Sequence, residues 1–468
     1  MVLFPVHIVH YIKWLRLRDG GVVRAVIDIA ALLAARDKQS THVTIVTTDD
    51  ADAHAVPQLL THLPNQLPNL TLLKLNLVDP IAKIKGRSVR DATGDTPTQI
   101  LDATSRASFR TLLQGGPKLT GSIQGGPVLP RADVLHLHGI WTTSNWQAAA
   151  IARSLCVPYV VSSHGMLDRW CMTQGSAKKM VHLALASGKG LRAARAIHCT
   201  ARAEAEQAHA AVKGITTRVV ELPFDATPFA PHATREAAIL AARAAFPELY
   251  AKAAGAPIVL FMSRLHAKKG VLPLIQAWKE LASCSTLKPL PMLALAGPFD
   301  PPSYESVVRD AVKTSPLRDR IALLGSIQGD AKLALLQAAD LFILPTSQEN
   351  FGYAILESLA SGTPVVTTKG VDIWQELEQS GGCVIVEPAP ANIAATVAKL
   401  LTDIGDHEGG LRLMGLRGKA WANAYSNPEE LATRYQQMYT GIGNNGGMLL
   451  VGECVKYPGN EAGRRKGN

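Results

Sequence analysis

Short, uninterrupted runs of Val, Ile and Leu recur along this 468-residue chain, and stretches with helical periodicity separate them. A strand with one face in water alternates apolar and polar residues, whereas a continuous apolar run needs cover on both faces. Clear examples are VHIVHYI at residue 6, VLHLHGI at 134, PIVLFMSR at 257 and LFILPTS at 341. The pattern therefore predicts an α/β fold of doubly wound parallel sheets covered by helices.

These runs form two series, which predicts two doubly wound domains, in line with roughly 100–200 residues per domain. The first series ends near Thr200 and the second begins at Pro257, so we place the boundary at Leu222-Pro223-Phe224-Asp225. The repeated QGGP within a Gly-rich stretch has a loop composition, which predicts an irregular insertion. The expected divisions are a first domain at 1–224 with the insertion at 84–131, a second domain at 225–424, a helix at 425–441 crossing back to the first domain, and a disordered tail at 442–468.

The charge is uneven along the chain. Residues 1–224 contain 25 Lys and Arg against 15 Asp and Glu, whereas the remaining residues balance at 23 each, so the net +10 lies in the first half. Such a surface attracts anions, and we expect weak peripheral association with an anionic membrane and no nucleic acid as partner.

The six cysteines contain no Cys-x-x-Cys pair, and no run of 18 apolar residues occurs. The start of the chain also lacks the basic stretch and cleavage site of a secretory signal. These features predict a cytoplasmic protein, attached at most to the inner face of the membrane, with no zinc site and no disulfide framework.

The strongest functional pattern is LFILPTSQENFGYAILESLASGTPVVTT, residues 341–368. A buried strand leads into a polar turn, and a helix then ends at Gly362 ahead of Pro364. Glu349 consequently follows a strand, and Glu357 lies two turns into the helix. Ligands of open α/β sheets bind at this strand edge, where the amides of Asn350, Phe351 and Gly352 can face an anionic oxygen.

A second pattern, LFMSRLHAKKG, places Arg264 just after a strand and Lys269 just before a helix. Two fixed cations at such a position can neutralise a diphosphate. The first half offers Gly20 and Gly21 after its first strand, where glycine permits close backbone approach. His138 and His164 each follow a later strand, where a neutral imidazole can bind a hydroxyl or move a proton.

The two glutamates have seven residues between them and ENFG at the first, and they resemble the signature of retaining glycosyltransferase family 4, glycosyl transferases group 1. The resemblance extends over residues 1 to about 440 and implies the GT-B fold, two Rossmann-like domains facing across a cleft. It implies that Glu349 contacts the transferred sugar and Glu357 the nucleotide ribose. Arg264 and Lys269 match the diphosphate-binding pair of the family.

The same resemblance covers the glycines of the first loop and an HGML element at His164. It implies that a nucleoside-diphosphate sugar binds the second domain and a saccharide or lipid-linked saccharide acceptor binds the first, in surface polysaccharide or glycoconjugate synthesis. We expect the pocket around Ile327 to select the base of the nucleotide. The usual Asn-Gly-x-Asp at the domain junction is replaced by Leu222-Pro223-Phe224-Asp225, which leaves the linker contacts undefined.

No Asp-x-Asp pair follows a strand in the second domain, so we expect neither a metal nor another cofactor, with the leaving diphosphate met by Arg264 and Lys269. Two alternatives stay open from the residues. A sugar-nucleotide epimerase has the same two-domain architecture but needs acid and base groups acting on the sugar ring. A non-catalytic nucleotide-sugar-binding protein would keep the fold without the transfer.

Overall fold

The computed structural model describes most of the chain, and both units into which its contacts divide the chain are α/β. One unit comprises residues 1–162, 181–197 and 432–468, and the other comprises 163–180 and 198–431. The described ranges are 6–16, 20–38, 40–48, 67–79, 99–116, 129–173, 175–284, 287–402, 410–425 and 427–440. The predicted tail at 442–468 and the second QGGP lie outside these ranges.

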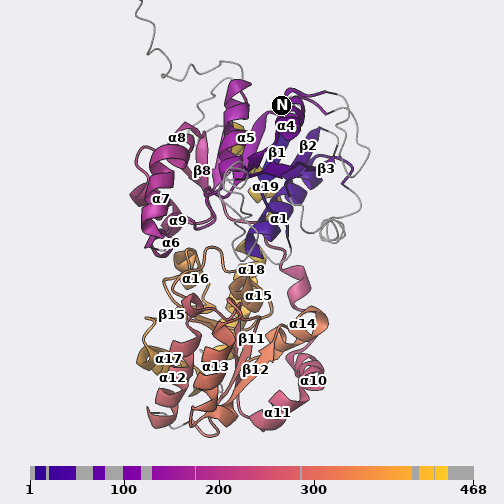
Figure 1. Ribbon diagram of the computed structural model, residues 1–468. Coiled ribbons are helices and arrows are strands. Elements are labelled where there is room, and N and C mark those ends of the chain that lie inside the picture. Colours follow the sequence, from indigo (N-terminus) through magenta and orange to yellow (C-terminus); the bar gives the residue numbers. More distant parts are fainter. Residues whose placement is uncertain are drawn as a thin grey trace, which may run out of the picture. The chain divides into compact units, whose positions relative to one another are not determined.

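The first sheet has seven strands in the order β3-β2-β1-β6-β7-β8-β9 (Figure 1). Its registered pairs are parallel, with β1 hydrogen-bonded to both β2 and β6. Its strands are β1 (Val6–Ile12), β2 (Thr41–Thr47), β3 (Leu70–Lys74), β6 (Val134–His138), β7 (Tyr159–Ser162), β8 (Ala196–Cys199) and β9 (Thr217–Val219). Most of these segments are the apolar runs picked out from the sequence.

The second sheet has six parallel strands in the order β12-β11-β10-β13-β14-β15. Its strands are β10 (Ile258–Met262), β11 (Met292–Ala296), β12 (Ile321–Gly325), β13 (Leu341–Leu344), β14 (Val365–Thr367) and β15 (Cys383–Ile385). Strands β10, β11 and β13 are buried throughout, as continuous apolar runs require. The predicted doubly wound α/β class is therefore confirmed.

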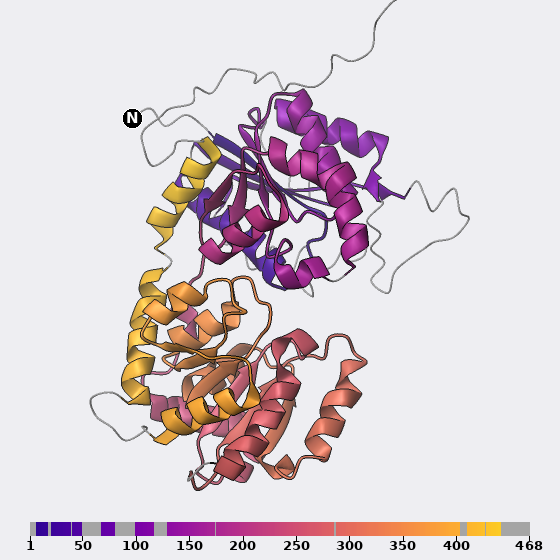
Figure 2. The same cartoon turned by 90° about the vertical axis from the view of Figure 1, so that its left-hand side faces the viewer.

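Helices cover both faces of each sheet (Figures 1 and 2). Those that precede the second sheet in sequence are α1 (Gly21–Arg36), α4 (Ala103–Gln114), α5 (Thr143–Ser154), α6 (Arg169–Thr173), α7 (Ser176–His182), α8 (Gly188–Ala193), α9 (Arg202–Ala211), α10 (Arg235–Ala245) and α11 (Pro247–Ala253). The others are α12 (Val271–Cys284), α13 (Tyr304–Lys313), α14 (Gly329–Ala338), α15 (Tyr353–Ala360), α16 (Trp374–Gln379), α17 (Pro390–Thr402), α18 (Leu411–Tyr425) and α19 (Pro428–Thr440).

In both sheets the strand order reverses beside the first strand in sequence. The chain winds outward from β1 through β2 to β3 and returns to pair β6 on the other side of β1; β10 and β13 have the same relation. Successive loops on the two sides of such a reversal diverge and leave a crevice at the carboxyl ends of the strands. The fold therefore provides one ligand-binding position at each sheet.

Residues 103–114 differ from the irregular structure predicted for 84–131. They form helix α4, which begins at Asp102, whose carboxylate accepts a hydrogen bond from the Ser105 amide. Phe109, Leu112 and Leu113 are buried on one side of this helix, in the three- and four-residue spacing that a helix needs. The Gly-rich sequence that follows concealed this pattern.

The state of the cysteines differs from the predicted absence of a disulfide framework. Cys171, Cys199 and Cys383 carry free thiols, but Cys156 is disulfide-bonded, so the prediction of a chain without disulfides is wrong at this residue. Within the described ranges, no helix is both long and apolar enough to span a bilayer.

Candidate functional site

Two loops meet at the strand reversal of the second sheet. The loop after β10 contains Arg264 and Lys269, and the loop after β13 contains Glu349; the two strands are hydrogen-bonded neighbours. Gly270 permits their close approach: its φ is +75°, and a Cβ there would lie 2.2 Å from the Pro345 carbonyl oxygen. Neither a side chain nor an unstrained L-residue fits at this position.

Lys269 and Glu349 form the central ion pair of this site. The Lys269 Nζ lies 2.5 Å from Glu349 Oε2 and also donates to the Gln348 carbonyl at 3.1 Å. The lysine side chain is 3% exposed, whereas the glutamate side chain is 27% exposed. Burial alone would raise the pKa of Glu349, but the adjacent Lys269 ammonium holds that pKa below its usual value. Glu349 is therefore a carboxylate near neutral pH.

Two more cations lie on the loop after β10. The Arg264 guanidinium contacts Asp300 at 2.6 Å, and both side chains are largely exposed. The Lys268 ammonium donates to Gln348 Oε1 at 2.7 Å and lies 5.3 Å from the Trp170 ring centroid. Burial, followed by repulsion from Lys269, lowers the pKa of Lys268. The site thus gathers positive charge where the sequence predicted it.

Helix α15 begins at Tyr353, directly after Gly352, whose φ of +73° is left-handed, so Asn350 and Phe351 precede the helix instead of opening it as predicted. The first amides of a helix have no partner within the helix and favour an anion. The Phe351 ring is buried against Tyr353 and Tyr425, so only its main chain is available for a ligand. The Asn350 side chain donates to Asp372 Oδ2 at 3.0 Å.

Glu357 and Ile327 lie on neighbouring parts of the same unit. Glu357 is buried within α15, and its Oε2 accepts from Lys332 of α14 at 2.8 Å. Ile327 is half-buried in the loop between β12 and α14. The lysine partner of Glu357 was not predicted from the sequence, because it is distant along the chain.

Asp372 is a buried carboxyl that sequence reasoning missed. Its backbone amide donates to the Glu349 carbonyl at 3.0 Å, and its side chain accepts from Gln207 at 2.9 Å as well as from Asn350. Burial, and then repulsion from the Glu204 carboxylate, raises the pKa of Asp372 to about 7. Asp372 is therefore tied to the glutamate loop through both main chain and side chain.

His164 occupies a strained turn that Glu204 holds in place. The φ of His164 is +49°, a left-handed value that is uncommon outside glycine. On either side of it, the Ser163 hydroxyl and the Gly165 amide each donate to Glu204 Oε1 at 2.7 Å. The Thr200 amide and hydroxyl donate to Oε2 of the same carboxylate at 2.7 and 2.9 Å.

These contacts determine the charge states of both residues. Burial alone would raise the pKa of Glu204, but its hydrogen-bond donors lower that pKa, so the carboxylate stays ionised. Burial lowers the pKa of His164, although Glu204 opposes the shift, and the imidazole is neutral near pH 7. The sequence shows only the local part of this arrangement, a Thr four residues before Glu204 at a helix start; the contacts of Glu204 with the His164 turn depend on tertiary packing.

The remaining predicted residues belong to the first unit. Gly20 has a φ of +65° and precedes α1, whose first residue is Gly21; a Cβ at Gly20 would meet nothing within 4 Å. His138 is buried at the end of β6, where its Nε2 lies 3.0 Å from His10 Nδ1. Their proposed contacts with a ligand stay predictions.

Two protein families match the chain. The glycosyl transferase 4-like domain matches residues 20–225, and glycosyl transferases group 1 matches residues 243–408. Two successive regions of the chain are therefore similar to glycosyltransferase domains. Together they contain the strand reversal of the second sheet and most of the residues of the candidate site.

Two curated relatives match part of the chain. An uncharacterized glycosyltransferase of Methanocaldococcus jannaschii, MJ1607, is 30% identical over 152 residues, 32% of this chain and 37% of the relative. The D-inositol 3-phosphate glycosyltransferase of Corynebacterium efficiens is 31% identical over 150 residues, 32% of this chain and 35% of the relative. The matched part is thus about a third of the length of these relatives.

Solved structures match nearly the whole chain. Anabaena HepE in complex with UDP and glucose aligns with a TM-score of 0.65 at 19% identity, covering 93% of this chain and all of HepE. WaaG, a glycosyltransferase involved in lipopolysaccharide biosynthesis, aligns with a TM-score of 0.55 at 16% identity. The alignment covers 93% of this chain and 100% of WaaG. This likeness shows the GT-B fold.

Because the pKa of Asp372 is raised, Asp372→Asn should increase the free energy of unfolding by an amount that depends on pH. The native state holds its proton up to about pH 7, whereas the unfolded chain releases it near pH 4, so wild-type stability falls as pH rises across that window. The Asn side chain does not ionise, so the variant does not lose this stability. Its free energy of unfolding should exceed that of the wild type by a difference that approaches about 4 kcal/mol at pH 8. Urea unfolding at pH 5 and pH 8 measures the difference.

The matched control for this test is Asp319→Asn, at an exposed carboxyl on the same unit. It should change the free energy of unfolding by a similar small amount at both pH values. An Asp372→Asn effect that is equal at pH 5 and pH 8, or larger at pH 5, contradicts the buried-carboxyl account.

Proposed function

We propose that this chain is a retaining glycosyltransferase of family 4 that moves a sugar from a nucleoside-diphosphate sugar to a saccharide or lipid-linked saccharide. The product would contribute to a surface polysaccharide or glycoconjugate. The observation that carries the proposal is the Lys269–Glu349 pair at the strand reversal, with Arg264 on the same loop. A cation for the phosphates and a carboxylate for the sugar are thereby placed at one sheet edge.

In this proposal the cations receive the leaving diphosphate. Lys269 is buried and held by two oxygens, so its charge is fixed in place before the substrate arrives. Arg264 is exposed, and an exposed ion pair is worth about 0–1 kcal/mol, so phosphate oxygens can replace Asp300 at little cost. The first amides of α15 add the positive end of a helix dipole.

Glu349 serves as an ionised acceptor rather than an acid. Its lowered pKa leaves no proton to donate near pH 7. The carboxylate can accept hydrogen bonds from sugar hydroxyls and stabilise positive charge that develops at the anomeric carbon. We propose front-face displacement, in which the departing phosphate helps to take the acceptor proton, and we assign Glu349 no covalent nucleophile role.

His164, Glu357 and Ile327 complete the donor site in this proposal. Neutral His164 can exchange hydrogen bonds with a sugar hydroxyl, and the Glu204 contacts on both sides of it fix its position. Glu357 would accept a hydrogen bond from the ribose, with Lys332 paired to its carboxylate. Ile327 would line the pocket for the nucleotide base. HepE is a neighbour crystallised with UDP-glucose, which supports a nucleotide-sugar donor.

The acceptor is proposed to bind the first domain near Gly20, Gly21 and His138. The net positive charge of residues 1–224 favours weak peripheral attachment to an anionic membrane, which would bring a lipid-linked acceptor close. Full-length protein should co-sediment with anionic vesicles at low salt and dissociate at high salt. Protein that stays in the supernatant at low salt contradicts the membrane part of the proposal and favours a water-soluble acceptor.

Two alternatives are separated by product analysis. A sugar-nucleotide epimerase would return an isomerised donor or free sugar without any acceptor, and a binding protein would leave the donor intact. The ion pair and the neutral histidine favour transfer, because a binding role requires neither. Anomeric analysis of the product tests retention.

Glu349→Gln should lower turnover by about 10²–10³-fold, because one transition-state contact changes from a charged to a neutral acceptor. The amide has nearly the same shape, so nucleotide affinity should change little. Donor hydrolysis and transfer with a panel of nucleoside-diphosphate sugars provide the measurement. Glu378→Gln, at an exposed glutamate of α16, is the control. Near wild-type turnover in Glu349→Gln would refute its assigned role.

The double variant Arg264→Gln, Lys269→Gln should lose about 10–100-fold or more in affinity for the nucleoside diphosphate, since charge-assisted hydrogen bonds contribute about 1.5–3 kcal/mol. Affinity for the free nucleoside should change far less, because it carries no phosphate. Calorimetry measures both, with exposed Lys313→Gln as control. All titrations contain EDTA, because the proposal has protein cations and no metal at the phosphates. Equal losses for both ligands would place the diphosphate elsewhere, and wild-type binding abolished by EDTA would require a metal.

A further inference from the structure

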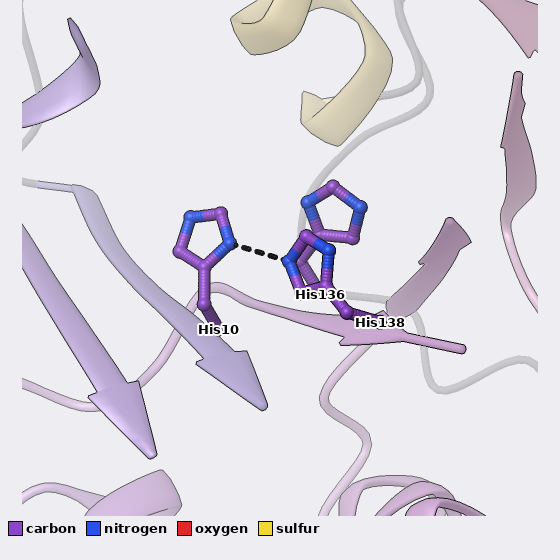
Figure 3. A group of neighbouring side chains, drawn as sticks. All are labelled: His10, His136 and His138. Carbon is purple, nitrogen blue, oxygen red and sulfur yellow. Dashed lines mark hydrogen bonds between the residues drawn. The ribbon is translucent and has the colours of Figure 1, made fainter. Parts of the chain in front are cut away.

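Three histidines lie together on the first sheet, away from the ion pair described above. His10 is in β1, and His136 and His138 are two residues apart in the adjacent β6, so all three side chains project from the same face (Figure 3). The register places His10 beside His136 and Ile12 beside His138. All three are buried, with His10 and His136 at 0% exposure.

Three imidazoles are clustered at these buried positions. Both faces of a parallel sheet are covered, and a buried polar group costs free energy unless a partner compensates for it. The ring centroids are 4.3–5.3 Å apart. His10 and His138 contact each other and His136 contacts two hydroxyls, so hydrogen bonds hold the rings close together. A ligand that binds several imidazoles at once fits such a cluster.

We propose that His10, His136 and His138 bind one transition-metal ion, with Zn(II) as the best-fitting candidate. Each residue offers one ring nitrogen, and these three atoms lie within 4.8 Å of one another. His10 Nδ1 and His138 Nε2 are 3.0 Å apart. Nitrogens about 2.0–2.1 Å from a tetrahedral zinc are separated by roughly 3.3 Å, so this pair is close to the required spacing. Binding requires the His136 nitrogen, which lies within 4.8 Å of the other two, to move closer to them.

The surroundings of His136 strengthen this assignment. Its Nδ1 lies 2.8 Å from the Tyr439 hydroxyl of α19, and its Nε2 lies 2.7 Å from the Ser162 hydroxyl at the end of β7. A metal-binding histidine normally has its second nitrogen fixed by a hydrogen bond. Whichever nitrogen of His136 binds the ion, a hydroxyl remains to hold the other.

The chemistry of the ligand atoms determines which kind of ion can bind. Neutral imidazole suits zinc, copper and nickel, whereas magnesium and calcium prefer oxygen ligands. Binding breaks the hydrogen bond between His10 and His138: the proton that they share moves to the outer nitrogen of its own ring, and both inner lone pairs face the ion. No proton is released by a neutral imidazole, and water can take the fourth position.

Such an ion would be structural and would not act in transfer. It would join β1 to β6 at the reversal of the first sheet and, through His136 and Tyr439, connect both strands to α19. The inference does not depend on the proposed glycosyl transfer, because no residue of the proposed diphosphate site takes part. It assigns His138 to the ion in place of the acceptor contact proposed above.

The test uses the full chain, stripped with a chelator and then dialysed. Titration with Zn(II) alone, followed by calorimetry, should show one saturable site per chain, and thermal unfolding should shift upward with bound zinc. Co(II) in the same protein should give the visible bands of a four- or five-coordinate nitrogen site without a thiolate charge-transfer band. Absence of saturable one-to-one binding, or a thiolate band, would overturn the proposal.

Variants then locate the ion. His10→Gln and His138→Gln should each weaken zinc binding by more than the roughly 10–100-fold that outer-shell changes cost. His7→Gln is the matched control: His7 is also buried in β1, but it faces away and contacts the Pro130 carbonyl and Thr44. Equal binding in all three variants, or an equal loss in His7→Gln, would contradict the assignment. If a variant fails to fold, the cobalt spectrum of the wild type still tests whether a nitrogen-ligated site exists.

Discussion

The buried ammonium of Lys269 is the group around which the candidate site is organised. A charge removed from water is stable only with partners, and here the partners are the Gln348 carbonyl and the Glu349 carboxylate, both on the loop after β13. Because β10 and β13 are adjacent parallel strands, their loops leave the sheet at the same edge. Strand order and one ion pair together bring two distant parts of the sequence to a single position.

Around this pair, burial divides the ionisable groups into charged and neutral members. Glu349 and Glu204 remain carboxylates because cations or hydrogen-bond donors offset their desolvation. Asp372 and His164 have fewer compensating contacts, and their pKa values move toward the neutral form. A site that contains an ionised carboxylate and a neutral imidazole near pH 7 can bind a neutral sugar through hydrogen bonds while its lysines and arginine meet the phosphates.

Local patterns predicted much of this architecture. Continuous apolar runs identified most strands of both sheets, although not β3 or β9, and the residues that follow the strands included Glu349, Lys269 and His164. The sequence could not indicate that Lys332 pairs with Glu357, or that Glu204 and Asp372 are linked to these loops, because such contacts depend on tertiary packing. Helix α4 was missed since its apolar face lies beside Gly-rich sequence. The histidines of β1 and β6 were separated by more than 120 residues, and only strand pairing brings them together.

Hydrogen exchange of the full chain, with and without each common nucleoside diphosphate, tests most directly whether the second sheet holds the donor. The account predicts that at least one nucleoside diphosphate slows exchange in residues 263–271 and 345–353, the two loops at the β10–β13 reversal. Protection confined to the loops that follow β1 and β6, or no protection with any nucleoside diphosphate at saturating concentration, would contradict it.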